Sequence, residues 1–210
     1  METSISLVFA AFVGFTHAFE VDHLLAVSSI VTKRNSMLAA VKDGIYWGLG
    51  HTSTILVIGM LMIVARVAVT EHTFHLFEAG VGMMLVALGA HRIWKTWTHE
   101  RYHRTAHSHH LPHHHRLAYG VGLVHGLAGS GTLVLLVMTR LHDNVESIAY
   151  LLIFGLGSVG GMLLASGLFS LPFSKKVSFG RSIQLSLTLI SATLCILFGL
   201  KVVWENLTQA

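Results

Sequence analysis

The sequence predicts an all-α integral membrane protein whose six transmembrane helices form two inverted three-helix repeats. Its composition is 53% hydrophobic and only 11% charged, whereas about 25% of residues are charged in soluble proteins. Six apolar segments are long enough to cross a bilayer, which takes roughly 20 residues, and short motifs recur in both halves. Nothing is left for a separate soluble domain, so residues 1–210 are predicted to form a single membrane domain.

The apolar segments are interpreted as helices because a backbone inside lipid must satisfy its own hydrogen bonds. Both prolines agree with this division, since Pro112 lies between segments and Pro172 lies at the end of one. The single cysteine, Cys195, excludes a disulfide framework within the chain. The predicted helices cover residues 5–31, 44–69, 74–97, 117–140, 146–171 and 182–205.

Lysine and arginine predict the orientation in the membrane. Of these 14 basic residues, 11 lie in or beside the first, third and fifth connections between predicted helices. Because cytoplasmic connections are enriched in such residues, we expect both termini outside and these three connections in the cytoplasm of a protein in the cell (inner) membrane. The basic pI of about 9.5 is therefore interpreted as a topology signal and not as a sign of nucleic-acid binding.

The first apolar segment carries four ionisable side chains near its middle, His17, Glu20, Asp22 and His23. A charged side chain at the bilayer centre costs about 2.5–3.5 kcal/mol by insertion scales. Imidazole and carboxylate together suit a transition-metal site or a proton relay, and the alternative is a satisfied polar cluster that only holds helices together. Their number within one short stretch favours a functional site over packing.

A regular helix cannot direct these side chains at one ion. At about 100° per residue, His17 and Asp22 lie about 140° apart and His17 and His23 about 120° apart. We therefore expect an unwound turn or a π-bulge between His17 and His23, as in transporters with broken helices. If the helix were regular, Glu20 with one histidine and His51 would be the better ligand set.

His51 follows the second of two glycines in the second predicted helix, and three hydroxyl residues follow it. A lone membrane histidine is as often a structural hydrogen-bonder as a ligand, but beside the first cluster it becomes the fourth predicted ligand. We expect the hydroxyls to support the bound site by hydrogen bonds. We also expect Gly14 and the face of Gly48 and Gly50 to give the broken turn its room.

Three pairs of matching segments indicate that residues 5–97 are repeated in residues 117–205. An odd number of helices per repeat gives the two halves opposite topology, which is typical of transporters whose site lies near the bilayer midplane. The matches are residues 14–19 with 122–127, residues 48–51 with 155–158, and Leu88, Gly89 and Trp94 with Phe198, Gly199 and Trp204.

The connection between the repeats, residues 98–116, carries half of the 16 histidines. This composition is typical of a disordered metal-binding tract that buffers or delivers metal, and the alternative is a solvated linker. The histidines in question are His99, His103, His107, His109, His110, His113, His114 and His115.

Residues 17–23 fit the H-x4-D-H motif of the nickel/cobalt transporter family, and residues 49–53 resemble its L-G-H-[ST]-[ST] motif. The six-helix length and residues 125–131 are similar to the smaller UreH-type urease accessory membrane proteins. The resemblance implies that Ni²⁺ or Co²⁺ is a transported ion and not a cofactor. One departure is that residues 129–133 lack the carboxylates of the motif G-x-D-T-A-T-E of classical members. The implied metal ligands are His17, Asp22, His23 and His51, with Glu20 and His125 as further candidates.

Residues and resemblance together predict a membrane permease, not an enzyme, that takes up nickel or cobalt through the intramembrane site. Histidine and carboxylate suit Ni²⁺, Co²⁺ or Zn²⁺, and the chain has no G-x4-G-K-[ST] loop for ATP. The expected partners are the divalent ion, the lipid bilayer and a cytoplasmic metallochaperone or urease accessory protein, but no nucleic acid. The alternatives are an exporter on the same scaffold and a non-transporting membrane metallochaperone.

Overall fold

The structure, a computed structural model, describes residues 2–31, 36–66, 70–101, 114–128, 143–173 and 180–209. All regular elements within these ranges are helical, which confirms the predicted all-α class. The elements are α1 (Glu2–His17), α2 (Val21–Val31), α3 (Met37–Ile63), α4 (Glu71–Arg101), α5 (His114–His125), α7 (Asn144–Ser170), the 3-10 helix η1 (Leu171–Phe173) and α8 (Arg181–Gln209).

Four of the helices, α3, α4, α7 and α8, are long and apolar enough to cross a membrane, and the bent pair of α1 and α2 adds a fifth if the two helices form one span. At about 1.5 Å per residue, the 27 residues of α3 extend about 40 Å, more than the ~30 Å hydrocarbon core. Large apolar side chains cover the outer faces, where Val57, Leu197 and Trp204 are 59%, 59% and 72% exposed. Such a surface suits lipid, so the chain is a multi-pass membrane protein.

Two differences between the helices and the predicted segments are the most important for the site. α3 begins at Met37 and not near residue 44, so that Lys42 and Asp43 are part of the helix. The apolar run marks the lipid-embedded length, whereas good helix formers such as lysine let the helix continue beyond it. Of the predicted span 117–140, α5 covers the residues up to His125, and residues 129–142 lie outside the described part. The sixth span therefore stays a prediction.

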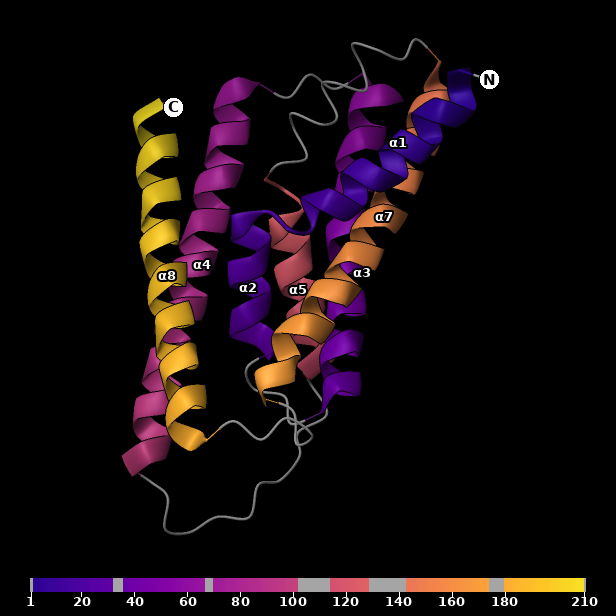
Figure 1. Cartoon of the computed structure of the whole chain (residues 1–210). Helices are drawn as coiled ribbons and strands as arrows, with labels where there is room; N and C mark the ends of the chain where they lie inside the picture. The colour runs from indigo at the N-terminus through magenta and orange to yellow at the C-terminus, as the bar shows by residue number, and fades with distance from the viewer. Residues whose placement is uncertain are drawn as a thin grey trace.

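The helices form two groups that α2 connects (Figure 1). The long helices α4 and α8 pack together on one side, and α1, α3, α5 and α7 form a bundle on the other. Both chain termini lie at one end of the molecule, whereas α2, α4 and α7 end at the other. The helix ends that flank the three basic connections are therefore on the same side of the molecule.

Glycines bring helix backbones into contact in two similar arrangements. α1 packs on α7, where a Cβ at Gly14 would overlap the carbonyl of Phe154. α5 packs on α3, where a Cβ at Gly122 would overlap the carbonyl of Trp47. Small residues at such crossings let membrane helices approach closely, and the α4–α8 pair is closed by glycines in the same way.

Two apolar clusters lie on either side of the middle of α3. One includes Trp47 and joins side chains of α2, α3, α4, α5, α7 and α8. The other includes Ile55 and joins side chains of α1, α3 and α7. His51 lies between Trp47 and Ile55, about one helical turn from each. His51 therefore lies in the middle of the bundle, between two apolar clusters.

Candidate metal centre

A short turn at residues 18–20 interrupts the helix between α1 and α2, and the two helix axes differ in direction by 56°. The amide of Glu20 donates to the carbonyl of His17 at 3.0 Å, which is a tighter i+3 bond at the end of α1. The amide of Leu24 donates to the carbonyl of Glu20 at 2.9 Å and starts α2. The unwound turn predicted between His17 and His23 is confirmed.

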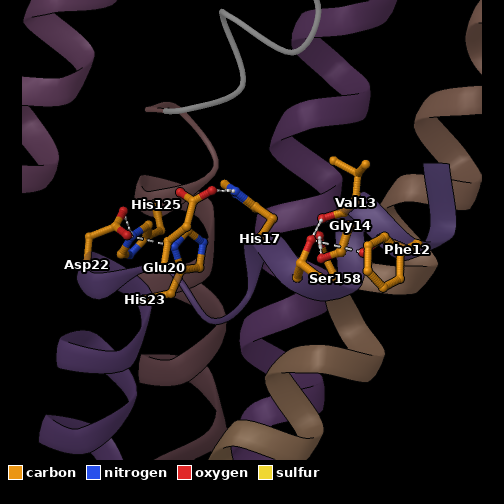
Figure 2. A network of polar contacts seen from close by, with 10 residues as sticks. Phe12, Val13, Gly14, His17, Glu20, Asp22, His23, His125 and Ser158 are labelled. Carbon is orange, nitrogen blue, oxygen red and sulfur yellow. Dashed lines mark hydrogen bonds and ion pairs between the residues drawn. The ribbon is translucent and has the colours of Figure 1, made fainter. Parts of the chain in front are cut away.

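Next to this turn, the backbone of α1 packs closely against α7. The carbonyl of Gly14, one turn before the break, accepts a hydrogen bond from Ser158 Oγ at 3.0 Å (Figure 2). The expectation that Gly48 and Gly50 give the turn its room is wrong. A Cβ at Gly50 would meet the backbone of α5, and one at Gly48 would meet α7, because the glycine face of α3 is covered by these two helices.

The break brings His17 and His23 together with His51 of α3. The ring centroids are 4.5 Å apart for His17 and His23, 5.1 Å for His23 and His51, and 5.3 Å for His17 and His51. One nitrogen of each ring lies within 4.8 Å of the other two. Nitrogen ligands at about 2.1 Å from one ion are at most about 4.2 Å apart, so small side-chain rotations would close this group around an ion.

Asp22 belongs to a second group, which includes His125 of α5 (Figure 2). His125 donates from Nε2 to Asp22 Oδ2 at 2.9 Å, and His23 donates from Nδ1 to Asp22 Oδ1 at 3.1 Å. Ligand atoms of Asp22, His23 and His125 also lie within 4.8 Å of one another. The residues predicted for one site are thus arranged as two adjoining groups that share His23.

The histidines are buried, yet several of their nitrogens have no protein partner. His23, His51 and His125 are 1%, 0% and 1% exposed. Within the described part of the chain, four buried ring nitrogens have no hydrogen-bond partner: His23 Nε2, both nitrogens of His51, and His125 Nδ1. A buried polar atom without a partner costs about 1–3 kcal/mol, and native proteins contain few of them. A cluster of such nitrogens can coordinate an ion that would satisfy them together.

Two carboxylates hold imidazole rings in position. His17 donates from Nδ1 to Glu20 Oε1 at 2.9 Å, and Asp22 holds Nδ1 of His23. Metal-binding histidines commonly donate their other N–H to a carboxylate, which selects the tautomer and directs the free nitrogen to the ion. The arrangement leaves Nε2 of His17 and Nε2 of His23 available. Glu20 therefore acts on the cluster through His17 and is not grouped with the other ligand atoms.

The carboxylates lie on the open side of the cluster. The side chains of Glu20, Asp22 and His17 are 58%, 24% and 12% exposed. On the buried side, the Trp47 ring lies 5.5 Å from His23 and the Phe154 ring lies 5.5 Å from His17. A cation that approaches from the open side meets negative charge first, and the aromatic rings wall the histidines on their buried side.

The hydroxyls after His51 do not support the cluster, contrary to the expectation. Thr52 Oγ1 donates to a carbonyl of α7 at 3.2 Å, and Thr54 Oγ1 donates to a carbonyl of α5 at 2.9 Å. Ser53 Oγ donates within its own helix at 2.7 Å. Consecutive side chains point in different directions around a helix, so the neighbours of His51 face the adjacent helices and not the histidines.

The histidine-rich stretch 98–116 lies mostly outside the described residues, which leave out 102–113. Its role in metal binding stays a prediction. Its last part is different from the predicted loop, because α5 begins at His114 and includes His115, which hydrogen-bonds Asp43 of α3. Asp43 was not singled out from the sequence, and Ser158 entered only as the position aligned with His51 in the repeat, since an acidic residue near a helix end and a serine in an apolar helix are common features.

A comparison with curated proteins finds a relative of this chain. The chain is 36% identical over 171 residues to the urease accessory protein UreH of Bacillus sp. (strain TB-90). The matched region covers 77% of this chain and 74% of that protein. No family model matches the chain, and no solved structure matches it.

Proposed function

This chain belongs to the UreH family of urease accessory proteins, and on that premise we propose that it is a membrane permease for Ni²⁺, with Co²⁺ as a second substrate. The observation that carries the proposal is the cluster of buried imidazole nitrogens without protein partners at the middle of α3. A nickel ion would replace the missing partners. The name of the relative agrees with this substrate, because urease is a nickel enzyme.

The chemistry of the cluster supports a borderline divalent ion. Imidazole nitrogen with carboxylate oxygen suits nickel and cobalt, whereas Cu(I) prefers thiolate or thioether ligands. Asp22 and Glu20 supply negative charge to offset a dication. A dication that enters a negative-inside cell gains about 4.6 kcal/mol per 100 mV, twice the value for a single charge. The membrane potential is therefore a sufficient driving force for uptake.

The two groups that share His23 suggest how an ion would move. We propose that the ion is bound first by one group and passes to the other while His23 stays attached. A rotation of the His23 ring would exchange its companions His17 and His51 for Asp22 and His125, the other two members of the second group. Shared ligands keep the ion coordinated throughout, which avoids the cost of a bare dication inside the membrane.

The inverted repeat and the orientation are further parts of the proposal. In the sequence alignment of the two halves, Gly14 corresponds to Gly122 and Phe154 corresponds to Trp47. Gly14 packs against the Phe154 carbonyl of α7, and Gly122 packs in the same way against the Trp47 carbonyl of α3. This relation is expected of two repeats with opposite topology. His17 corresponds to His125, so each repeat would contribute one histidine from the end of its first helix. The basic helix ends would face the cytoplasm.

Radioactive nickel uptake into proteoliposomes with an inside-negative potential tests the permease. His17→Ala and His51→Ala should each lower the uptake rate at least about tenfold, the usual minimum for disturbing a metal site. His91→Ala is the matched control, because His91 is exposed on α4, and it should transport like the unchanged protein. No uptake by the unchanged protein would refute the permease, and normal uptake by both cluster variants would refute the central cluster as its transport site. Histidine-dependent nickel binding without accumulation would instead indicate a non-transporting metallochaperone.

A further inference from the structure

A buried carboxylate lies near the start of α3, apart from the central cluster. Asp43 is 1% exposed, and it accepts a hydrogen bond from His115 Nδ1, in the first turn of α5, at 2.9 Å. The Tyr46 ring stacks on this imidazole at a centroid distance of 5.0 Å and an interplanar angle of 19°. Histidine, carboxylate and tyrosine thus hold one ring in a defined orientation.

The His115 side chain is only partly buried. The His115 side chain is 38% exposed, and no described residue hydrogen-bonds its Nε2. In the central cluster, carboxylates hold His17 and His23 by Nδ1 in the same way. A carboxylate on one nitrogen raises the basicity of the other nitrogen and directs it to a metal. The Asp43–His115 pair therefore has the chemistry of a metal ligand with its orienting partner.

The pair lies in line with the central cluster along two helices. Asp43, Trp47 and His51 are spaced by four residues along α3, so they follow one buried stripe. At 1.5 Å per residue, Asp43 is about 12 Å from His51 along the helix axis. The displacement is toward the end of the molecule where α2, α4 and α7 finish, which is the cytoplasmic end in the proposed orientation. Apolar side chains occupy the space between, among them Trp47 and Ala118 at 1% and 0% exposure.

We propose that His115, oriented by Asp43, is an inner metal ligand that receives Ni²⁺ after it has left the central cluster; the inference rests on the proposed function. One imidazole with water ligands binds an ion weakly, which suits a position that must pass the ion on. In the sequence, His115 lies at the end of the histidine-rich stretch.

A purely structural lock between α3 and α5 explains the pair less well. These helices are already held together by the backbone contact at Gly122 and by the Thr54 hydrogen bond. A lock does not need a buried carboxylate, because apolar residues in such a place usually serve stability as well or better. It also does not need an imidazole that is partly exposed.

Modification by diethylpyrocarbonate tests the ligand directly, because this reagent acylates a free imidazole nitrogen and a bound metal blocks it. The full-length protein in detergent is titrated with nickel chloride, and the modification of each histidine is quantified by peptide mass spectrometry. His115 should be protected saturably by nickel and not by Mg²⁺, whereas His91 on α4 should react equally at all concentrations. Equal modification of His115 with and without nickel would overturn the inner ligand.

Asp43→Asn tests the charge of the carboxylate, because asparagine is neutral and its side-chain oxygen can still accept the His115 hydrogen bond. The half-protecting nickel concentration for His115 should rise about tenfold or more, and an unchanged value would overturn the role of Asp43. If His115 is not protected while His51→Ala abolishes uptake, the inner ligand fails and the permease stands. If His115 is protected while the unchanged protein accumulates no nickel, the permease fails and nickel binding by His115 stands.

Discussion

Asp22→Asn is the most informative perturbation of the central cluster, because Asp22 accepts N–H groups from two histidines at once. Asparagine accepts through Oδ1 and donates through Nδ2, so one ring must now accept a hydrogen bond from the amide. If that ring is His23, its proton moves to Nε2, the nitrogen proposed for the ion. If it is His125, its Nε2 loses its anionic partner and its proton moves to Nδ1.

The expected magnitude follows from this hydrogen-bond count. Disturbing the carboxylate partner of a ligating histidine costs about 10–100-fold in metal affinity or activity, or about 1.4–2.7 kcal/mol. Asp22 serves two rings, so the upper part of this range is expected. Glu20→Gln is the matched control: Glu20 is 58% exposed and serves one ring, and glutamine still accepts that N–H. An exposed ion pair contributes about 0.2–1 kcal/mol, which corresponds to less than about sixfold.

The assay is the half-saturating nickel concentration for uptake into proteoliposomes. It is measured for the unchanged protein, Asp22→Asn and Glu20→Gln at equal amounts of folded protein, as judged by size-exclusion chromatography. Asp22→Asn should raise this concentration far more than Glu20→Gln. Equal effects of the two substitutions would refute the reasoning, because they would mean that only the charge matters and not the bridging of two rings.

Two further predictions concern packing and the histidine-rich stretch. Gly122→Ala should destabilise the protein by about 1–3 kcal/mol, because the added Cβ would overlap the Trp47 carbonyl. The control is Gly120→Ala, whose added Cβ meets nothing within 4 Å and which should be neutral or stabilise the protein by up to about 1 kcal/mol. Thermal unfolding in detergent measures both variants, and equal melting temperatures would contradict the close approach of α3 and α5. Deletion of residues 103–113 should leave substantial nickel uptake and raise the half-saturating nickel concentration, because weak multivalent binding outside the bilayer only gathers ions. Loss of all uptake by a normally expressed deletion variant would instead make the stretch part of the transport pathway.

Local properties of the sequence were enough to predict the helices and the broken turn. Helix spans depend on apolar length, which is read directly from the composition of each segment. The break between His17 and His23 follows from helix geometry alone, because three ligands at these spacings cannot share one face of a regular helix. The resemblance to the two family motifs then implied that His17, His23 and His51 belong to one site, without knowledge of the packing.

The partners of these residues were decided only by the tertiary structure. Asp22 is bonded to His125 because α5 packs on α3 through Gly122, and nothing local to Asp22 specifies a residue 103 positions away. The glycines near His51 face α5 and α7 for the same reason, although the sequence alone favoured a place beside the broken turn. Asp43 and His115 lie in two different predicted connections, just before the second and fourth predicted helices, and only the parallel docking of α3 and α5 joins them. Helix formation depends on contacts within a few residues, whereas a site in a bundle depends on which helix faces pack together. Small residues on several faces of a helix permit more than one such packing.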